Sequence, residues 1–148
     1  MGTGAMFMRD GLSLHHVGIA VKEIEPAVKT YVQRFGYEIV SATIHDPTQT
    51  AYVRFLRLPG DATFLEFVAP DGPASKLANA VAKGGGLNHL CYATRDIEAA
   101  AAKLQAQGMI QLQAPIPAVA FPGRRIAWLM GMDRVPIELV EISDESGL

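Results

Sequence analysis

The sequence contains an internal repeat, and this feature constrains the fold more than any other. Segments 14–21 (LHHVGIAV) and 87–94 (LNHLCYAT) share an apolar alternation and carry a histidine at their third position. Further landmarks recur in the same order at an offset of 72 or 73 residues: Ile24-Glu25 with Ile97-Glu98, Gly36 with Gly108, and the run 64–68 (FLEFV) with 136–140 (PIELV). Because only two copies are present, the repeat predicts a pair of similar modules.

Each half has the hydrophobic pattern of one strand, one helix and three further strands. The first helix has apolar residues at helical spacing, Pro26 in its first turn and Gly36 just beyond its end. In the second half, Asp96 is placed to cap the helix. The expected helices are 24–35 and 96–107, and the expected strands are 13–21, 37–44, 50–58, 62–69, 87–94, 109–113, 124–130 and 135–143.

These patterns predict an α+β fold in which two tandem βαβββ modules form a pseudo-symmetric, cup-shaped mixed β-sheet with helices outside. The proline-rich stretch 114–123 is expected to be a loop or an irregular edge of the sheet. The predicted organisation is a single domain over 12–142, with modules of about 12–70 and 87–142, a linker 71–86 holding a short helix from 73 to 83, and a flexible tail over 1–11.

Composition excludes several classes of function. The chain has 148 residues, a net charge of −2 and a single cysteine, Cys91. This charge does not favour binding to a nucleic acid or to an anionic membrane. A lone cysteine cannot form an internal disulfide and fits a reducing compartment. No apolar run approaches the roughly 20 residues that span a bilayer, and the N-terminus lacks the pattern of a signal peptide. We therefore expect a cytoplasmic protein.

Four polar residues recur at repeat positions on strands that are otherwise apolar. Because strand side chains alternate, His16 lies on the face of its strand that carries small residues. Glu66 lies on the face opposite that of the apolar Leu65 and Phe67, and His89 and Glu138 have the same positions in the second half. Buried carboxylates without partners are costly, and two of them close together repel. One divalent cation bound by the four side chains removes both problems and leaves coordination positions open.

Two βαβββ modules that each supply a His and a Glu resemble the vicinal oxygen chelate superfamily of glyoxalases, bleomycin-resistance proteins and dioxygenases. The resemblance runs from about Leu12 to Ile142. Segments 16–21, 86–92, 124–129 and 136–141 are most similar to the methylmalonyl-CoA epimerases. Those enzymes commonly have Gln at the position of Glu66, whereas a His, Glu, His, Glu set resembles glyoxalase I, the lactoylglutathione lyase.

The resemblance implies a metal-dependent isomerase or epimerase that removes a proton next to a metal-bound carbonyl. The metal would be Co, Ni, Mn, Zn or Mg, and the substrate a small molecule such as a thioester. Some such epimerases are thought to use a further Glu on the third strand, but 51–58 contains no acid, so Glu138 or Glu66 is the candidate base and Glu141 a weaker one. Two alternatives stay open: a glyoxalase I-type lyase and a non-catalytic drug- or metabolite-binding protein. Relatives are frequently homodimers.

Several arginines are candidates for binding an anionic part of the substrate. Arg54 and Arg57 lie on the expected third strand, and Arg124 and Arg125 begin the penultimate one. The other interpretation of each is an exposed cation at the edge of the sheet. His15 falls on the strand face opposite His16, and His45 lies near a turn, so neither is expected to bind the metal.

Overall fold

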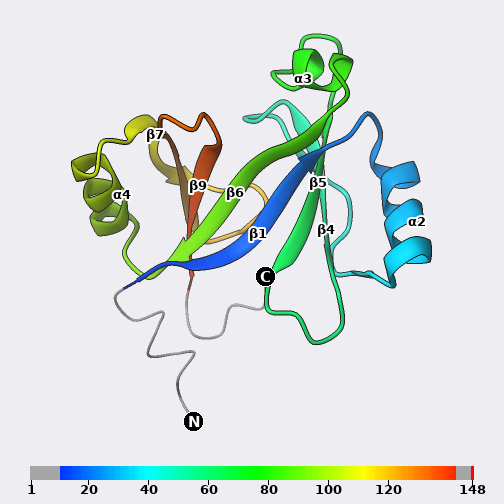
Figure 1. Ribbon diagram of the computed structural model, residues 1–148, viewed down its shortest axis with the longest axis horizontal. Helices are drawn as coiled ribbons and strands as arrows, with labels where there is room; N and C mark the ends of the chain where they lie inside the picture. The colour runs from blue at the N-terminus through cyan, green and yellow to red at the C-terminus, as the bar shows by residue number, and fades with distance from the viewer. Residues whose placement is uncertain (1–10, 143–147) are drawn as a thin grey trace. The chain divides into compact units, whose positions relative to one another are not determined.

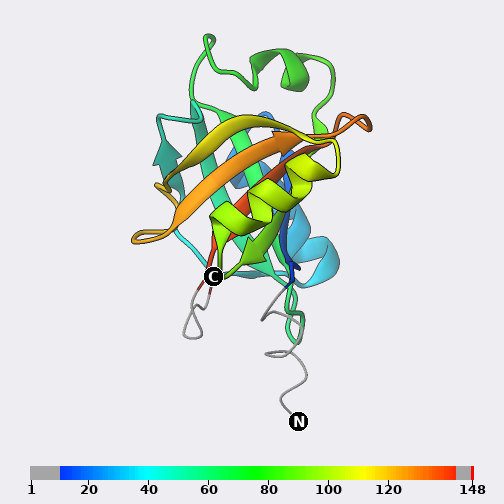
Figure 2. The same cartoon turned by 90° about the vertical axis from the view of Figure 1, so that its left-hand side faces the viewer.

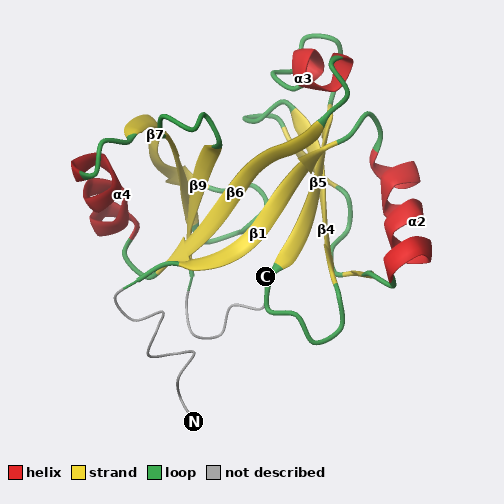
Figure 3. Cartoon of the chain, viewed as in Figure 1, coloured by secondary structure: helices red, strands yellow, loops and turns green. Residues whose placement is uncertain are grey.

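The computed structural model describes residues 11–142 and Leu148, and the predicted tail over 1–11 lies, apart from Gly11, outside them. These residues form nine strands and three helices, with both parallel and antiparallel strand pairs. The α+β class with mixed strand pairing is therefore confirmed, and Figure 3 shows the distribution of its helices and strands. None of the helices in the described part of the chain is long and apolar enough to cross a membrane.

The described residues divide into two compact units, one of residues 16–88 and one that combines 11–15 with 89–142 and Leu148. We call them the first and the second unit. The boundaries fall inside strands β1 (Ser13–Ala20) and β6 (Gly86–Thr94). The predicted single domain over 12–142 with its linker stays a prediction.

The first unit contains strands in the order β2-β4-β5-β1. Strand β5 (Phe64–Pro70) pairs parallel with β1 and antiparallel with β4 (Ala51–Arg57), which in turn pairs with the two short strands β2 (Glu38–Ile39) and β3 (Ile44–Asp46). Helix α2 (Ile24–Phe35) has the predicted bounds, and Gly36 closes it in the left-handed conformation with φ of 81°. Figure 1 shows α2 beside the strands of this unit.

The prediction of a single strand over 37–44 is wrong, because the structure has two short strands there, β2 and β3. The hydrogen-bond ladder with β4 is interrupted at Ser41. There the Ser41 hydroxyl oxygen, in place of a main-chain carbonyl, accepts the hydrogen bond from the Phe55 amide at 2.9 Å. The linker helix is also shorter than expected: α3 covers only Ala78–Ala82. Gly84, Gly85 and Gly86 follow it with positive φ angles, which glycine adopts without steric cost.

The second unit contains strands in the order β6-β9-β8-β7. The predicted cap of helix α4 (Ile97–Ala106) is confirmed, since the Asp96 carboxylate accepts a hydrogen bond from the Ala99 amide. Strands β8 (Arg125–Met130) and β9 (Pro136–Glu141) lie close to their expected bounds. Strand β7 (Ile110–Pro117) is longer than expected, but its register shifts twice against β8, as an irregular edge strand containing prolines would.

In each unit the helix covers the apolar face of its own strands. Beneath α2 the buried residues are Ile24, Val28, Leu56, Leu65, Phe67 and Ala69. Beneath α4 they are Ile97, Ala101, Ala127, Leu129 and Leu139. Figure 2 shows α4 lying across the strands of the second unit. Because strand side chains alternate, Glu66 and Glu138 point to the face opposite these helices.

Candidate metal centre

The first unit brings His16 and Glu66 together on the face opposite α2. Strands β1 and β5 run parallel with Gly18 opposite Glu66, so His16 lies two residues before the glutamate's register partner. The imidazole Nε2 is 3.2 Å from a carboxylate oxygen of Glu66. Both residues are buried, His16 fully and Glu66 with 6% of its surface exposed. The ring of Phe55 contacts the imidazole edge-on, at 5.2 Å between centroids.

The second unit repeats this arrangement with His89 and Glu138. Strands β6 and β9 also run parallel, with Cys91 opposite Glu138, so the histidine again lies two residues before the glutamate's partner. Nε2 of His89 is 3.4 Å from a carboxylate oxygen of Glu138, and both side chains are buried. Trp128, directly opposite Glu138 on β8, places its ring against His89 at a centroid distance of 5.0 Å.

Both pairs have the ligand types of a divalent metal site. Each histidine offers a ring nitrogen and each glutamate a carboxylate oxygen, and all four residues, His16, Glu66, His89 and Glu138, are buried. Imidazole and carboxylate together suit Zn, Mn, Co, Ni and Fe. Burial of a carboxylate is unfavourable unless a hydrogen bond or a cation compensates it. Each His–Glu pair therefore offers donors that fit a divalent ion.

Arg54 lies on the other face of its strand. It is opposite Phe67 in the β4–β5 register, on the side that α2 covers. Its guanidinium donates to a carboxylate oxygen of Glu25 at 2.9 Å and to the main-chain oxygen of Ser41 at 3.1 Å. In the first unit, Arg54 thus connects the start of α2 to β4, away from the face of His16 and Glu66.

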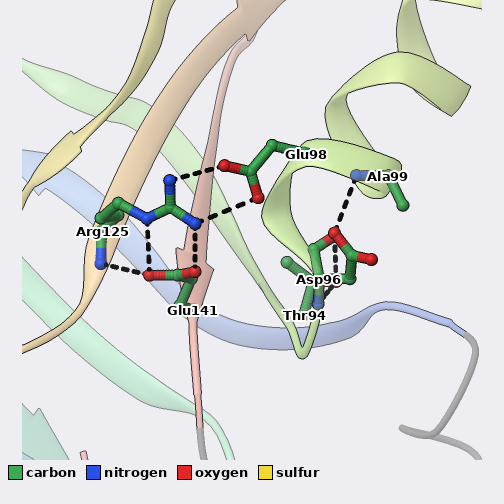
Figure 4. Close-up of polar contacts among 6 residues, drawn as sticks. All are labelled: Thr94, Asp96, Glu98, Ala99, Arg125 and Glu141. Atoms are coloured by element: carbon green, nitrogen blue, oxygen red, sulfur yellow. Dashed lines mark hydrogen bonds and ion pairs between the residues drawn. The ribbon is translucent and has the colours of Figure 1, made fainter.

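Arg125 forms a network that joins three elements of the second unit (Figure 4). Its guanidinium donates to Glu141 on β9, at 2.7 and 3.1 Å, and to Glu98 in the first turn of α4, at 2.5 and 3.0 Å. These hydrogen bonds lower the pKa of both carboxyl groups and raise the pKa of Arg125. Glu141 is on the helix side of β9, as expected from its alternation with Glu138, and both of its carboxylate oxygens accept hydrogen bonds from Arg125.

Arg124 is held by a different set of contacts. Its guanidinium lies 5.0 Å above the ring of Phe121 and donates to the main-chain oxygen of Leu148 at 2.6 Å. Partial burial lowers the pKa of Arg124. Arg124 and Arg125 therefore both have partners within the second unit.

The structure also locates the two other histidines and the cysteine. His15 is buried and packs edge-on against Phe121, at 5.4 Å between ring centroids. His45 lies on β3, where its Nε2 is 2.9 Å from a carboxylate oxygen of Asp71. Cys91 is fully buried.

Phe55 and Trp128, whose rings contact the two histidines, were not predicted as site residues. The signal that could have found them is strand pairing: antiparallel partners share a face, and these residues are opposite Glu66 and Glu138. A single sequence does not supply the register, so alternation along one strand leaves the cross-strand neighbours undetermined.

The chain belongs to the glyoxalase/bleomycin resistance protein/dioxygenase superfamily, whose family model matches residues 15–128. A curated relative, the ethylmalonyl-CoA/methylmalonyl-CoA epimerase of Cereibacter sphaeroides, is 34% identical over 122 residues, covering 81% of this chain and 89% of the relative.

Among solved structures, methylmalonyl-CoA epimerase from Mycobacterium tuberculosis has a TM-score of 0.78 at 29% identity, covering 89% of each chain. A variant of the Streptomyces coelicolor methylmalonyl-CoA epimerase, in complex with 2-nitronate-propionyl-CoA, has a TM-score of 0.76 at 28% identity. This match covers 88% of the present chain and 96% of the other. The sequence-based resemblance to this superfamily and to its epimerases is confirmed.

Proposed function

We propose that the chain is a divalent-metal-dependent epimerase acting on a 2-substituted acyl-CoA thioester of the methylmalonyl-CoA type. The observation that carries the proposal is the repetition of one buried His–Glu pair, at the same register, in both units. The epimerase relative at 34% identity gives the reaction class independent support.

In this proposal His16, Glu66, His89 and Glu138 bind one metal ion together. Two imidazoles and two carboxylates would leave coordination positions of a divalent ion open for the substrate. The metal contributes Lewis-acid stabilisation of negative charge on the substrate carbonyl. The rings of Phe55 and Trp128 pack edge-on against the two imidazoles and so restrict their rotation.

Proton transfer at C2 of the substrate is assigned to Glu138 or Glu66. Strand β4 has no acidic residue, and Glu141 is bound to Arg125 on the other face of β9. Of Glu66 and Glu138, one carboxylate takes the C2 proton and leaves an enolate, and the other, in its protonated form, returns a proton to the opposite face to give the epimer. Burial keeps bulk water from the carboxylates and so strengthens their electrostatic effect.

A second candidate is a glyoxalase I-type lyase, favoured by the presence of Glu rather than Gln at position 66. Its chemistry also moves a proton next to a carbonyl, but on the thiol adduct of a ketoaldehyde. A binding protein of the bleomycin-resistance type is less well supported, since it has no need of the buried ligand set. The predicted cytoplasmic location and homodimer stay predictions.

The test is exchange of solvent deuterium into C2 of methylmalonyl-CoA, with metal-loaded protein and mass spectrometric detection. We expect exchange with the wild type and its loss with Glu138→Gln. The matched control is Glu141→Gln, which changes the same residue type on the same strand but on the opposite face. Activity only with methylglyoxal and glutathione would establish the lyase instead. Ligand binding without turnover and without metal would establish a binding protein.

A further inference from the structure

Arg57 lies on the same face of the first unit as His16 and Glu66. Phe55 is opposite Glu66 and Leu56 is opposite Leu65, so the next pair in the antiparallel register is Arg57 with Phe64. The guanidinium lies 4.8 Å above the Phe64 ring, which places both side chains on one face. Phe64 is in turn the register partner of His16 on β1.

This position makes Arg57 a close neighbour of a proposed metal ligand. Residues diagonal to each other across an antiparallel pair have Cβ atoms about 7–8 Å apart, within reach of a long side chain. Arg57 and Glu66 have this relation. An arginine side chain can therefore extend from β4 towards a substrate whose carbonyl is bound next to Glu66.

The guanidinium of Arg57 keeps its hydrogen-bonding capacity. Among the described residues it makes a ring contact with Phe64 but no ion pair and no hydrogen bond. Glu38, its register partner on β2, is exposed and lies beyond ion-pair distance. Arg54, Arg124 and Arg125, by contrast, all donate to oxygen atoms of the protein.

We propose that Arg57, supported by Phe64, is the residue that binds an anionic group of the substrate. Its planar fork of N–H donors matches the two oxygens of a carboxylate or a phosphate. Stacking on Phe64 restricts the guanidinium and lowers the entropy lost on binding. The proximity to Glu66 favours the carboxylate of the acyl group, which is only a few bonds from the thioester carbonyl, over the phosphates of the coenzyme A part.

The inference rests on the proposed function for the identity of the substrate, and its test separates the two. The variants are Arg57→Ala and Arg57→Lys, with Arg34→Ala as the matched control, because Arg34 also lies over a phenylalanine ring in the first unit, that of Phe35. For Arg57→Ala we expect KM for methylmalonyl-CoA to rise on the order of 10- to 100-fold, the worth of a hydrogen bond to a charged group. We expect kcat to change little, Arg57→Lys to recover part of the loss, and Arg34→Ala to behave as the wild type.

Calorimetric titration with malonate and, separately, with free coenzyme A identifies the anion. Weaker malonate binding by Arg57→Ala assigns the carboxylate, and weaker coenzyme A binding assigns the phosphates. If the wild type turns over methylmalonyl-CoA and Arg57→Ala leaves KM and both titrations unchanged, the role of Arg57 is refuted and the proposed function stands. If no exchange occurs but Arg57→Ala weakens either probe, the proposed function fails and the anion site stands. A wild type that neither exchanges nor binds either probe refutes both.

Discussion

Replacing Leu139 by alanine should destabilise the second unit without affecting the metal ligand next to it in sequence. Leu139 is fully buried under α4 and is opposite Ala127 on β8. The substitution removes three carbon atoms from the core, at about 0.8 kcal/mol per buried methylene, and leaves a cavity. We therefore expect a loss of about 3 kcal/mol in the free energy of unfolding, within the range of about 2–5 kcal/mol for such changes.

The assay is urea unfolding followed by circular dichroism, with Leu112→Ala as the control. Leu112 has 56% of its surface exposed on β7, so its replacement should cost less than about 0.5 kcal/mol. A loss of about 3 kcal/mol lowers Tm by about 6–12 °C in a chain of this size. Because Leu139 points away from Glu138, the metal content of the folded variant should equal that of the wild type. Equal losses for the two variants, or loss of metal from folded Leu139→Ala, would refute the assignment of the two faces.

Two further substitutions test local features of the units. Arg125→Gln should lower Tm at pH 7, because Arg125 lowers the pKa of its two carboxylate partners in the folded chain. The stability gained from these ion pairs is fully present above the ordinary carboxyl pKa of 4.5 and is lost as the pH falls through the lowered pKa values. The difference in Tm between the variant and the wild type should therefore narrow as the pH falls below 4.5, and a difference that stays constant would contradict this origin. Gly85→Ala should cost about 2 kcal/mol or more in urea unfolding, because a Cβ there would overlap the carbonyl oxygen of Ala20 in addition to the strain of a positive φ. Gly84→Ala has the strain but meets open space, so an equal cost for both would rule out the overlap.

The fold was largely predictable because its signals are local. The alternation of Leu65 and Phe67 with Glu66 fixes which face of β5 lies under the helix, and Gly36 marks the end of α2. The strand over 37–44 could not be predicted correctly, because its interruption depends on a hydrogen bond between Ser41 and the amide of Phe55, 14 residues away. No pattern within the segment itself reveals that contact.

The metal-binding candidates were predictable from the repeat, whereas the roles of the arginines were not. Arg54 and Arg57 are three residues apart, so alternation alone separates them onto opposite faces of β4, but only the pairing of β4 with β5 shows that Arg57 shares the face of Glu66. Arg125 had the appearance of a substrate-binding residue until the structure placed it between Glu98 and Glu141. Which partner satisfies a long charged side chain is decided by tertiary contacts, and these are not encoded in spacing.

Elemental analysis can show whether the four side chains bind one metal ion. It is applied to the purified protein and to four variants with alanine at His16, Glu66, His89 and Glu138. We expect one divalent ion per wild-type chain and loss of most of that ion in every variant, with the variants still folded by circular dichroism. A metal-free wild type would contradict this expectation. So would retention of the full metal content by any of the four variants, since the side chain removed would then not be a ligand.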